Sequence, residues 1–295
     1  MDAILIAGPT ASGKSGLALD LAARHGGVVV NADSMQVYEG LRVLTARPTA
    51  DEMSGIEHRL YGHVPAETAY STGRWVEDAE AVYGDIAAGG RLPIFVGGTG
   101  LYFGALLGGL SPIPAVPAEI RARWRQRLTE EGAAALHAEL AVRDGVMAGQ
   151  LDPANGQRIV RALEVLEATG RSIRDFQDRP GRPLVPPERV RKILLMPERA
   201  DLRARIDRRF DMMVEAGALD EARALLARSL DPALPVMKAI GVRELGAHLE
   251  GKLSLEEAVE RAKAASRQYA KRQATWFRNR FDGSWQVAEL PGAIK

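Results

Sequence analysis

A glycine-rich stretch near the N-terminus, residues 8–15, constrains the fold of this chain more than any other feature. It reads Gly-Pro-Thr-Ala-Ser-Gly-Lys-Ser and fits the phosphate-binding pattern G-x-x-x-x-G-K-[ST]. The apolar run 3–7 precedes it and the amphipathic segment 17–23 follows it, so the loop joins a buried strand to a helix. A chance glycine-rich turn does not explain strand, motif and helix in register. The sequence therefore predicts a polyphosphate site.

The chemistry of this loop follows from its residue types. Glycines let backbone N–H groups turn toward an anion, and the N-terminus of the next helix adds its positive dipole end. Lys14 can lie against phosphate oxygens, and the Ser15 hydroxyl suits a Mg²⁺ ion bound to them. The motif does not exclude ATP, because such a loop contacts only the phosphates and not the group attached to them. The residues assigned to the phosphates are Gly8, Pro9, Thr10, Ala11, Ser12, Gly13, Lys14 and Ser15.

The rest of the chain alternates strands and helices with one interruption. Strands are expected at 28–30, 91–96 and 190–196, and helices at 75–86 and 199–210. Three prolines between 112 and 117 break this alternation, and helices at 120–128, 133–140 and 157–168 follow. We predict an α/β fold: a P-loop NTPase-like core with a mostly parallel sheet flanked by helices, made of residues 1–115 and 187–295, and an all-helical insertion domain, 116–186.

Two polar side chains are expected beside the phosphate loop, because ligands bind outside the carboxyl ends of parallel strands. Asp33 follows the strand 28–30, and Thr99 stands among glycines after the strand 91–96. An aspartate in this place suits a metal or water partner. The alternative is a helix-capping or turn aspartate, since Asp-Ser is common at helix starts.

Two helices are dense in cations. The helix 199–210 is rich in arginine, and at least one arginine is expected to face phosphate; the alternative is a solvated face paired with Asp201, Asp207 and Asp211. The segment 261–280 holds seven Lys and Arg residues, no acidic residue, and Tyr269, Trp276 and Phe277 among them. This is typical of a surface that follows a nucleic-acid backbone. The alternative is a solvated basic helix whose aromatic rings pack inward.

Composition narrows the function classes. The 295 residues include no cysteine, which excludes disulfides, cysteine–zinc modules and cysteine nucleophiles. His58 and His63 have no carboxylate at ligand spacing, so a metal site there is not expected. No charged-then-apolar leader and no apolar run of ~20 residues is visible, so we expect a cytoplasmic protein without a membrane span.

The order of five motifs resembles that of bacterial tRNA dimethylallyltransferases, the isopentenyl-tRNA transferase (IPP transferase) family. The motifs lie at 8–15, 33–38, 97–102, 157–165 and 266–278. The resemblance implies transfer of the dimethylallyl group from dimethylallyl diphosphate to the exocyclic amine of the adenosine 3′-adjacent to the anticodon of tRNA, with release of diphosphate. It also implies Mg²⁺ as cofactor and a monomeric enzyme.

The resemblance assigns roles to residues already singled out. Asp33 would be the general base, Thr99 would bond the bridging oxygen of the leaving diphosphate, and Lys14 and Arg205 would neutralise its charge. The target base would be extruded into a channel between core and insertion. Lys238 stands where the family has an arginine, and the stretch 150–156 departs from the family pattern. The residues expected at tRNA are Asp33, Ser34, Met35, Gln36, Thr99, Arg121, Gln157, Arg158, Ile159, Val160, Arg161, Lys238 and Arg243.

Three other functions fit part of the sequence. A P-loop kinase of a small metabolite and an adenylate prenyltransferase share the phosphate loop, but give no reason for the helical insertion or the segment 261–280. A nucleotide-binding RNA module without chemistry has no need of Asp33 and Thr99 together.

Overall fold

The computed structural model describes residues 1–179 and 181–294 of the chain, which divides into two compact units. The first joins Met1–Leu107 to Pro183–Lys295, and the second is Gly108–Arg182. The expected insertion, 116–186, had later bounds at both ends. The difference at the second boundary is explained by Leu184 and Val185, whose amides donate to the Leu106 carbonyl oxygen at 2.9 and 3.3 Å. No helix in the described part of the chain is long and apolar enough to cross a membrane.

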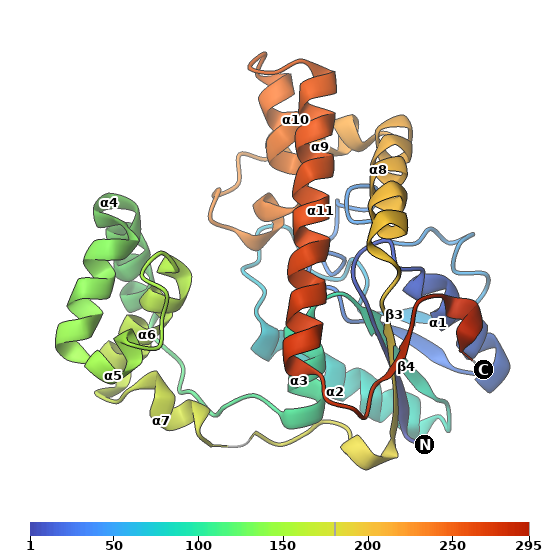
Figure 1. Ribbon diagram of the computed structural model, residues 1–295, viewed down its shortest axis with the longest axis horizontal. Helices are drawn as coiled ribbons and strands as arrows, with labels where there is room; N and C mark the ends of the chain where they lie inside the picture. The colour runs from blue at the N-terminus through green and yellow to red at the C-terminus, as the bar shows by residue number, and fades with distance from the viewer. Residues whose placement is uncertain (180, 295) are drawn as a thin grey trace. The chain divides into compact units, whose positions relative to one another are not determined.

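The first unit is built on a six-stranded sheet in the order β3-β2-β4-β1-β5-β6, and all five neighbouring pairs are parallel (Figure 1). This confirms the predicted α/β fold with a parallel sheet. The short edge strands β3 and β6 have too few residues to show a pattern in the sequence. The strands are β1 (Ala3–Ala7), β2 (Val28–Asn31), β3 (His58–Arg59), β4 (Pro93–Gly97), β5 (Val190–Leu195) and β6 (Gln286–Ala288).

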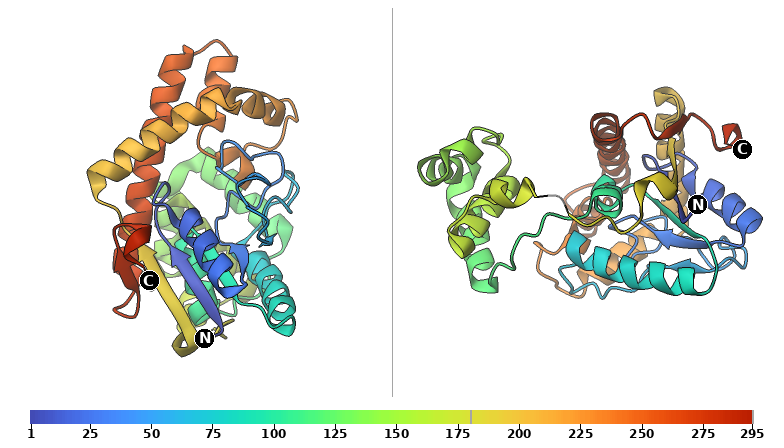
Figure 2. Two further views of the ribbon diagram at one scale, coloured as in Figure 1. Left: turned by 90° about the vertical axis from the view of Figure 1, so that its right-hand side faces the viewer. Right: turned by 90° about the horizontal axis from the view of Figure 1, so that it is seen from below.

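Helices cover both faces of this sheet, as the alternation of side chains along β1 requires. Ile4 and Ile6 pack with α1 (Lys14–His25) on one face, where η3 (Pro291–Ala293) also lies (Figure 2). Leu5 faces the other way, into the larger core with α2 (Thr72–Ala88) and α3 (Gly100–Gly108).

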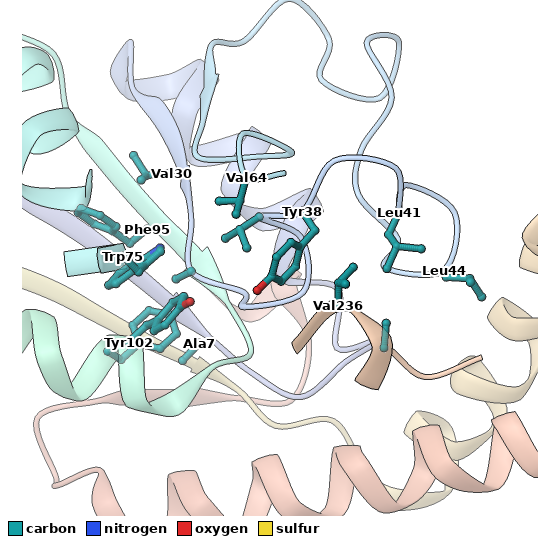
Figure 3. Packing of buried hydrophobic residues seen from close by; sticks show 14 of the residues in the cluster. Ala7, Val30, Tyr38, Leu41, Leu44, Val64, Trp75, Phe95, Tyr102 and Val236 are labelled. Carbon is teal, nitrogen blue, oxygen red and sulfur yellow. The ribbon is translucent and has the colours of Figure 1, made fainter. Parts of the chain in front are cut away.

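Aromatic packing fixes the second face of the sheet. Trp75 of α2 stacks on Tyr102 of α3 with ring centroids 4.0 Å apart, and meets Phe95 of β4 edge-on at 6.4 Å (Figure 3). The Trp75 indole N–H donates to the carbonyl oxygen of Asn31 at 3.1 Å. This hydrogen bond ties α2 to the carboxyl end of β2, where Asp33 follows.

Four further helices of this unit follow β5. The longest, α11 (Leu255–Arg280), begins at a capping box in which Ser254 and Glu257 exchange hydrogen bonds. It packs along α8 (Arg199–Glu215) and α10 (Val242–Leu249), and α9 (Ala218–Leu226) contacts both α8 and α10. A short 3₁₀ helix, η2 (Pro235–Lys238), lies between α9 and α10, and another, η1 (Pro187–Arg189), immediately precedes β5.

The second unit is all-helical over its described residues, as predicted, and has its own core around Trp124, Leu136 and Leu163. The helix α4 (Ala118–Arg143) contains a break at Gly132, whose backbone is not helical. Arg127 forms an ion pair with Glu139 at 2.7 Å across that break, whereas twelve residues of straight helix would span about 18 Å. The chain therefore reverses at Gly132, as two separate predicted helices require. The other helices are α5 (Gly145–Ala148), α6 (Gly156–Thr169) and α7 (Ile173–Gln177).

Candidate active site

Three loops with the predicted functional residues leave the same edge of the sheet. Because β4 lies between β1 and β2, the loop after β4 lies between the other two. Ala7 pairs with Gly97, and Asn31 pairs with Val96, so the three strands end at the same level. The sheet thus brings together the phosphate loop, Thr99 and Asp33, which are far apart in the sequence.

The phosphate loop and two arginines of α8 surround a cavity of about 290 Å³. Gly13 precedes α1 and makes no side-chain cap, so the first N–H groups of the helix are left for an anion. The residues around the cavity are Ala11, Ser12, Gly13, Lys14, Ser15, Arg205 and Arg209. This arrangement fits the expected binding of phosphates.

Not every amide of the loop faces that cavity. The Thr10 N–H donates to Gln273 at 2.9 Å and the Ser12 N–H donates to the carbonyl oxygen of Pro9 at 3.3 Å. These two amides are therefore used within the protein, and the other N–H groups of the loop are the ones expected to meet an anion. The Ser12 hydroxyl is fully buried and has no hydrogen-bond partner among the described residues. A buried hydroxyl without a partner is costly, and a phosphate oxygen in the cavity would supply one.

Lys14 is held inside the loop, its ammonium donating to the carbonyl oxygen of Pro9 at 3.2 Å. Its pKa is lowered to about 8, mainly by burial; the Asp33 carboxylate opposes this shift, and the charge of Arg209 adds a smaller lowering. A bound anion would stabilise the charged form of the Lys14 ammonium, and this ammonium would in turn stabilise the bound anion.

The pKa of Lys14 predicts how anion affinity varies with pH. An ordinary lysine keeps its charge to about pH 10.5, but Lys14 in the free protein loses its proton above about pH 8. We expect the affinity for inorganic diphosphate, measured by calorimetry, to fall as the pH rises through that value. In Lys14→Arg the guanidinium stays charged, so the variant reports the titration of the ligand alone. Parallel pH profiles for the two proteins would contradict this prediction.

Arg205 of α8, which the resemblance assigned to the diphosphate, lines the cavity together with Arg209. The Arg209 guanidinium donates to the Thr10 hydroxyl, and burial lowers its pKa while Asp33 partly restores it. Sequence reasoning did not single out Arg209, although the spacing of four puts it on the same helix face as Arg205.

The alternative for the arginine helix was partly right about its aspartates. Asp207 and Asp211 do form ion pairs, but with Arg267 and with Lys263 of α11, the latter at 2.7 Å. They therefore join two helices and do not pair with the arginines of α8.

Asp33 is held by its own turn, so the capping alternative was also partly right. Its Oδ1 accepts a hydrogen bond from the Met35 N–H at 3.0 Å, and its N–H donates to the Asn31 side chain at 2.9 Å. No described residue donates to the other carboxylate oxygen, Oδ2. One oxygen therefore fixes the side chain and the other is available to a substrate.

Tyrosines surround this carboxylate. Burial and then the charge of Asp33 raise the pKa of Tyr61, Tyr102 and Tyr269, so all three remain neutral. The surroundings of Asp33 thus combine one fixed charge with aromatic rings and protonated hydroxyls.

Thr99 is joined directly to the loop of Asp33. Its hydroxyl oxygen accepts from the Ser34 N–H at 2.9 Å, and its O–H donates to the Ser34 hydroxyl at 3.2 Å. The Thr99 N–H donates to the carbonyl oxygen of Ala32 at 3.2 Å. The backbone of the Asp33 loop therefore fixes the position of the hydroxyl.

Exposure separates the residues expected at tRNA into two groups. In the first unit Lys238 and Arg243 are exposed, and Ser34, Met35 and Gln36 are half-buried. In the second unit the exposed residues are Arg121, Gln157 and Arg158. Ile159 and Val160 are buried in the helical core, so the expectation that they contact RNA is wrong for their side chains. Arg161 is partly exposed and forms an ion pair with buried Glu164 at 3.3 Å. The Gln36 amide N–H₂ is already used, donating to the carbonyl oxygens of Thr45 and Ala46.

A second, larger cavity of about 470 Å³ lies between α8 and α11. Five cations line it and no carboxylate does; Arg267 pairs with Asp207, and the other four form no ion pair within the described residues. We call this the basic cleft; its cations are Arg199, Arg203, Arg267, Lys271 and Arg278. The aromatic rings of α11 point elsewhere, with Phe277 fully buried and Trp276 packed against Phe281. The rings of Trp276 and Phe277 therefore pack inward, as the alternative expected, while most of the cations of α11 are exposed.

The donor atoms near the phosphate loop decide which metal could bind. No group of three or more His, Asp or Glu side chains among the described residues could hold a metal. The loop offers the Ser15 hydroxyl, which is exposed at the start of α1. One protein oxygen fits a Mg²⁺ ion that is held mainly by phosphate oxygens and water, and does not fit a metal bound by the protein alone.

The fold and the site together define a class of protein: a parallel α/β core of P-loop-like form, with a cation-lined cavity beside a carboxylate. Comparison with known proteins identifies the family. The IPP transferase family matches residues 36–280, and the isopentenyl transferase family matches residues 1–64. The chain is 59% identical over 294 residues to the tRNA dimethylallyltransferase of Rhizobium meliloti (strain 1021), covering 100% of this chain and 97% of that protein.

Solved structures agree. The tRNA isopentenylpyrophosphate transferase of Bacillus halodurans is 36% identical with a TM-score of 0.68, over 97% of this chain and 90% of that one. A eukaryotic dimethylallyltransferase acting on tRNA is 30% identical with a TM-score of 0.80, over 93% of this chain and 69% of that one. The chain belongs to the tRNA dimethylallyltransferase family.

Proposed function

We propose that this protein transfers the dimethylallyl group of dimethylallyl diphosphate to the exocyclic amine of the adenosine 3′-adjacent to the anticodon of tRNA. Membership of the family makes the protein a transferase that moves a dimethylallyl group to tRNA. The donor, the acceptor atom and the residue roles form the proposal. One observation supports it most: the cavity at the phosphate loop, Thr99 and Asp33 lie at the carboxyl ends of the neighbouring strands β1, β4 and β2.

The reaction needs a base on one side and a stabilised leaving group on the other. The amine nitrogen forms a bond to the allylic carbon while the bond from that carbon to the diphosphate oxygen breaks. The electron pair goes to the diphosphate, and the proton of the amine goes to the available oxygen of Asp33. The Thr99 O–H turns from the Ser34 hydroxyl, to which it donates in the free protein, and donates to the bridging oxygen as negative charge develops there. Tyr269, which is neutral and partly exposed, provides an aromatic ring suited to an allyl group or a purine.

The cavity residues hold the diphosphate. Lys14, Arg205 and Arg209 supply positive charge, and the free N–H groups at the start of α1 add hydrogen bonds. Ser15 would hold Mg²⁺ together with the diphosphate, and the ion would neutralise further charge on the leaving group. The leaving diphosphate gains a negative charge as the carbon–oxygen bond breaks, so positive charge around it lowers the activation barrier.

Cations on both units support binding of tRNA. The basic cleft presents guanidinium and ammonium groups with no carboxylate, and the helical unit exposes Arg121 and Arg158. Such groups favour phosphate backbone contacts, whose affinity falls with salt. A cytoplasmic location and a monomeric state complete the proposal.

The choice of acceptor distinguishes the proposal from an adenylate prenyltransferase. Undermodified tRNA and AMP are offered separately with labelled dimethylallyl diphosphate and Mg²⁺, at increasing salt. We expect transfer to tRNA only, with kcat/KM falling steeply as salt rises. Transfer to AMP that does not depend on salt would contradict the proposal and would leave the basic cleft without a role.

A further inference from the structure

We propose that Gln273 is a positioning residue that sets the distance between the phosphate loop and Thr99. The inference rests on the proposed function, since it concerns how the leaving diphosphate meets the Thr99 hydroxyl. Gln273 belongs to α11, whereas the phosphate loop and the Thr99 loop follow strands of the sheet. Its side chain therefore joins these two loops from a separate helix.

Both ends of the Gln273 amide are used. Its Oε1 accepts from the Thr10 N–H at 2.9 Å, and its Nε2 donates to the carbonyl oxygen of Gly98 at 2.8 Å. The side chain is 6% exposed. Thr10 lies four residues before Lys14, and Gly98 immediately precedes Thr99. One buried side chain thus bridges the loop that binds the diphosphate and the loop that carries the hydroxyl.

The glycines after β4 make this approach possible. A Cβ at Gly98 would lie 2.1 Å from Nε2 of Gln273, and a Cβ at Gly100 would lie 2.2 Å from the ring of Trp276. Neither distance is compatible with a side chain at the glycine. The loop is therefore shaped to accept α11, and the hydrogen bonds of Gln273 are the polar part of that contact.

Such a bridge matters for rate more than for binding. The Lys14 ammonium and the Thr99 hydroxyl must contact the same diphosphate, one on its outer oxygens and one at the oxygen that leaves. A displacement of about 1 Å between catalytic groups costs up to about 100-fold in rate. Affinity for the diphosphate depends on the residues that line the cavity, and Gln273 is not one of them.

The test is the single-turnover rate of transfer to tRNA, with KM for each substrate measured beside it. In Gln273→Met, which keeps the length of the side chain, we expect the rate to fall about 100-fold, with both KM values within about threefold. Gly98→Ala should show the same loss, because the new methyl group displaces the Gln273 amide. In a double-mutant cycle with Gln273→Ala, the Gly98→Ala change should add little, since the group it displaces is already absent.

A matched control separates positioning from stability. Phe277→Leu changes a fully buried residue one turn along α11 and lowers the melting temperature without touching these hydrogen bonds. We expect it to keep the transfer rate within about threefold at temperatures where both variants are folded. An equal loss in Phe277→Leu, an unchanged rate in Gln273→Met, or additive effects in the cycle would overturn the inference. Failure of the wild-type protein to prenylate tRNA would instead refute the proposed function.

Discussion

Replacing Asp33 with alanine is expected to lower the turnover of tRNA prenylation by roughly 10²- to 10⁴-fold, the range for loss of a general base. Affinity for tRNA should stay within about threefold, because the backbone on both sides of Asp33 is fixed by other contacts. Asn31 donates to the carbonyl oxygens of Asp33 and Leu60 at 3.0 Å each, and Thr99 accepts from Ser34. Single-turnover kinetics and a tRNA binding assay measure the two quantities separately.

Asp33→Asn is the control for the turn. Its amide oxygen can still accept from the Met35 N–H, which Asp33 now does at 3.0 Å, but it cannot take a proton. We expect this variant to be as inactive as alanine and as stable as the wild type. If turnover and tRNA affinity fell together in both variants, Asp33 would be structural and the assignment of the base would be wrong.

Replacing Thr99 with valine is the second large effect. The hydroxyl is the donor at the strand end between the phosphate loop and Asp33, and the loss of one such donor costs roughly 10²- to 10³-fold in kcat. KM for the prenyl donor should change little, because the cavity cations remain. Steady-state kinetics with saturating tRNA measure both values.

Thr99→Ser restores a hydroxyl without the methyl group and should recover most of the rate. It also keeps an acceptor for the Ser34 N–H, which valine leaves without one. A serine variant as slow as the valine variant would show that the loop conformation, and not the hydroxyl, controls the rate.

The phosphate loop and the strand ends were predictable from sequence because their signals are local. Residues 8–15 match a motif whose geometry follows from glycine and helix physics, and parallel strands end on one side of a sheet. Asp33 and Thr99 could therefore be placed beside Lys14 before any coordinates were known. The two helices on either side of Gly132 were likewise predicted as separate helical segments, 120–128 and 133–140.

The contributions of α8 and α11 could not be predicted in detail, because they depend on tertiary packing. Gln273 reaches Thr10 across 263 residues, and Arg209 reaches the same residue across 199. The sequence shows both as members of cation-rich helices, and the helix face that contacts the loop is set by side chains of the core. The burial of Ile159 and Val160 was missed for a related reason: a motif marks a segment, but only the helix period separates its inner from its outer residues.

The transfer of the dimethylallyl group is tested by following two labels in parallel reactions. Dimethylallyl diphosphate, labelled in one sample at the allyl carbon and in another at the diphosphate, is incubated with unmodified tRNA and Mg²⁺, beside a reaction with labelled ATP. We expect the carbon label to enter an adenosine of tRNA, an equal amount of diphosphate label to be released, and no label from ATP to enter RNA. Phosphate label transferred from ATP to an acceptor, with no carbon label in tRNA, would contradict this expectation.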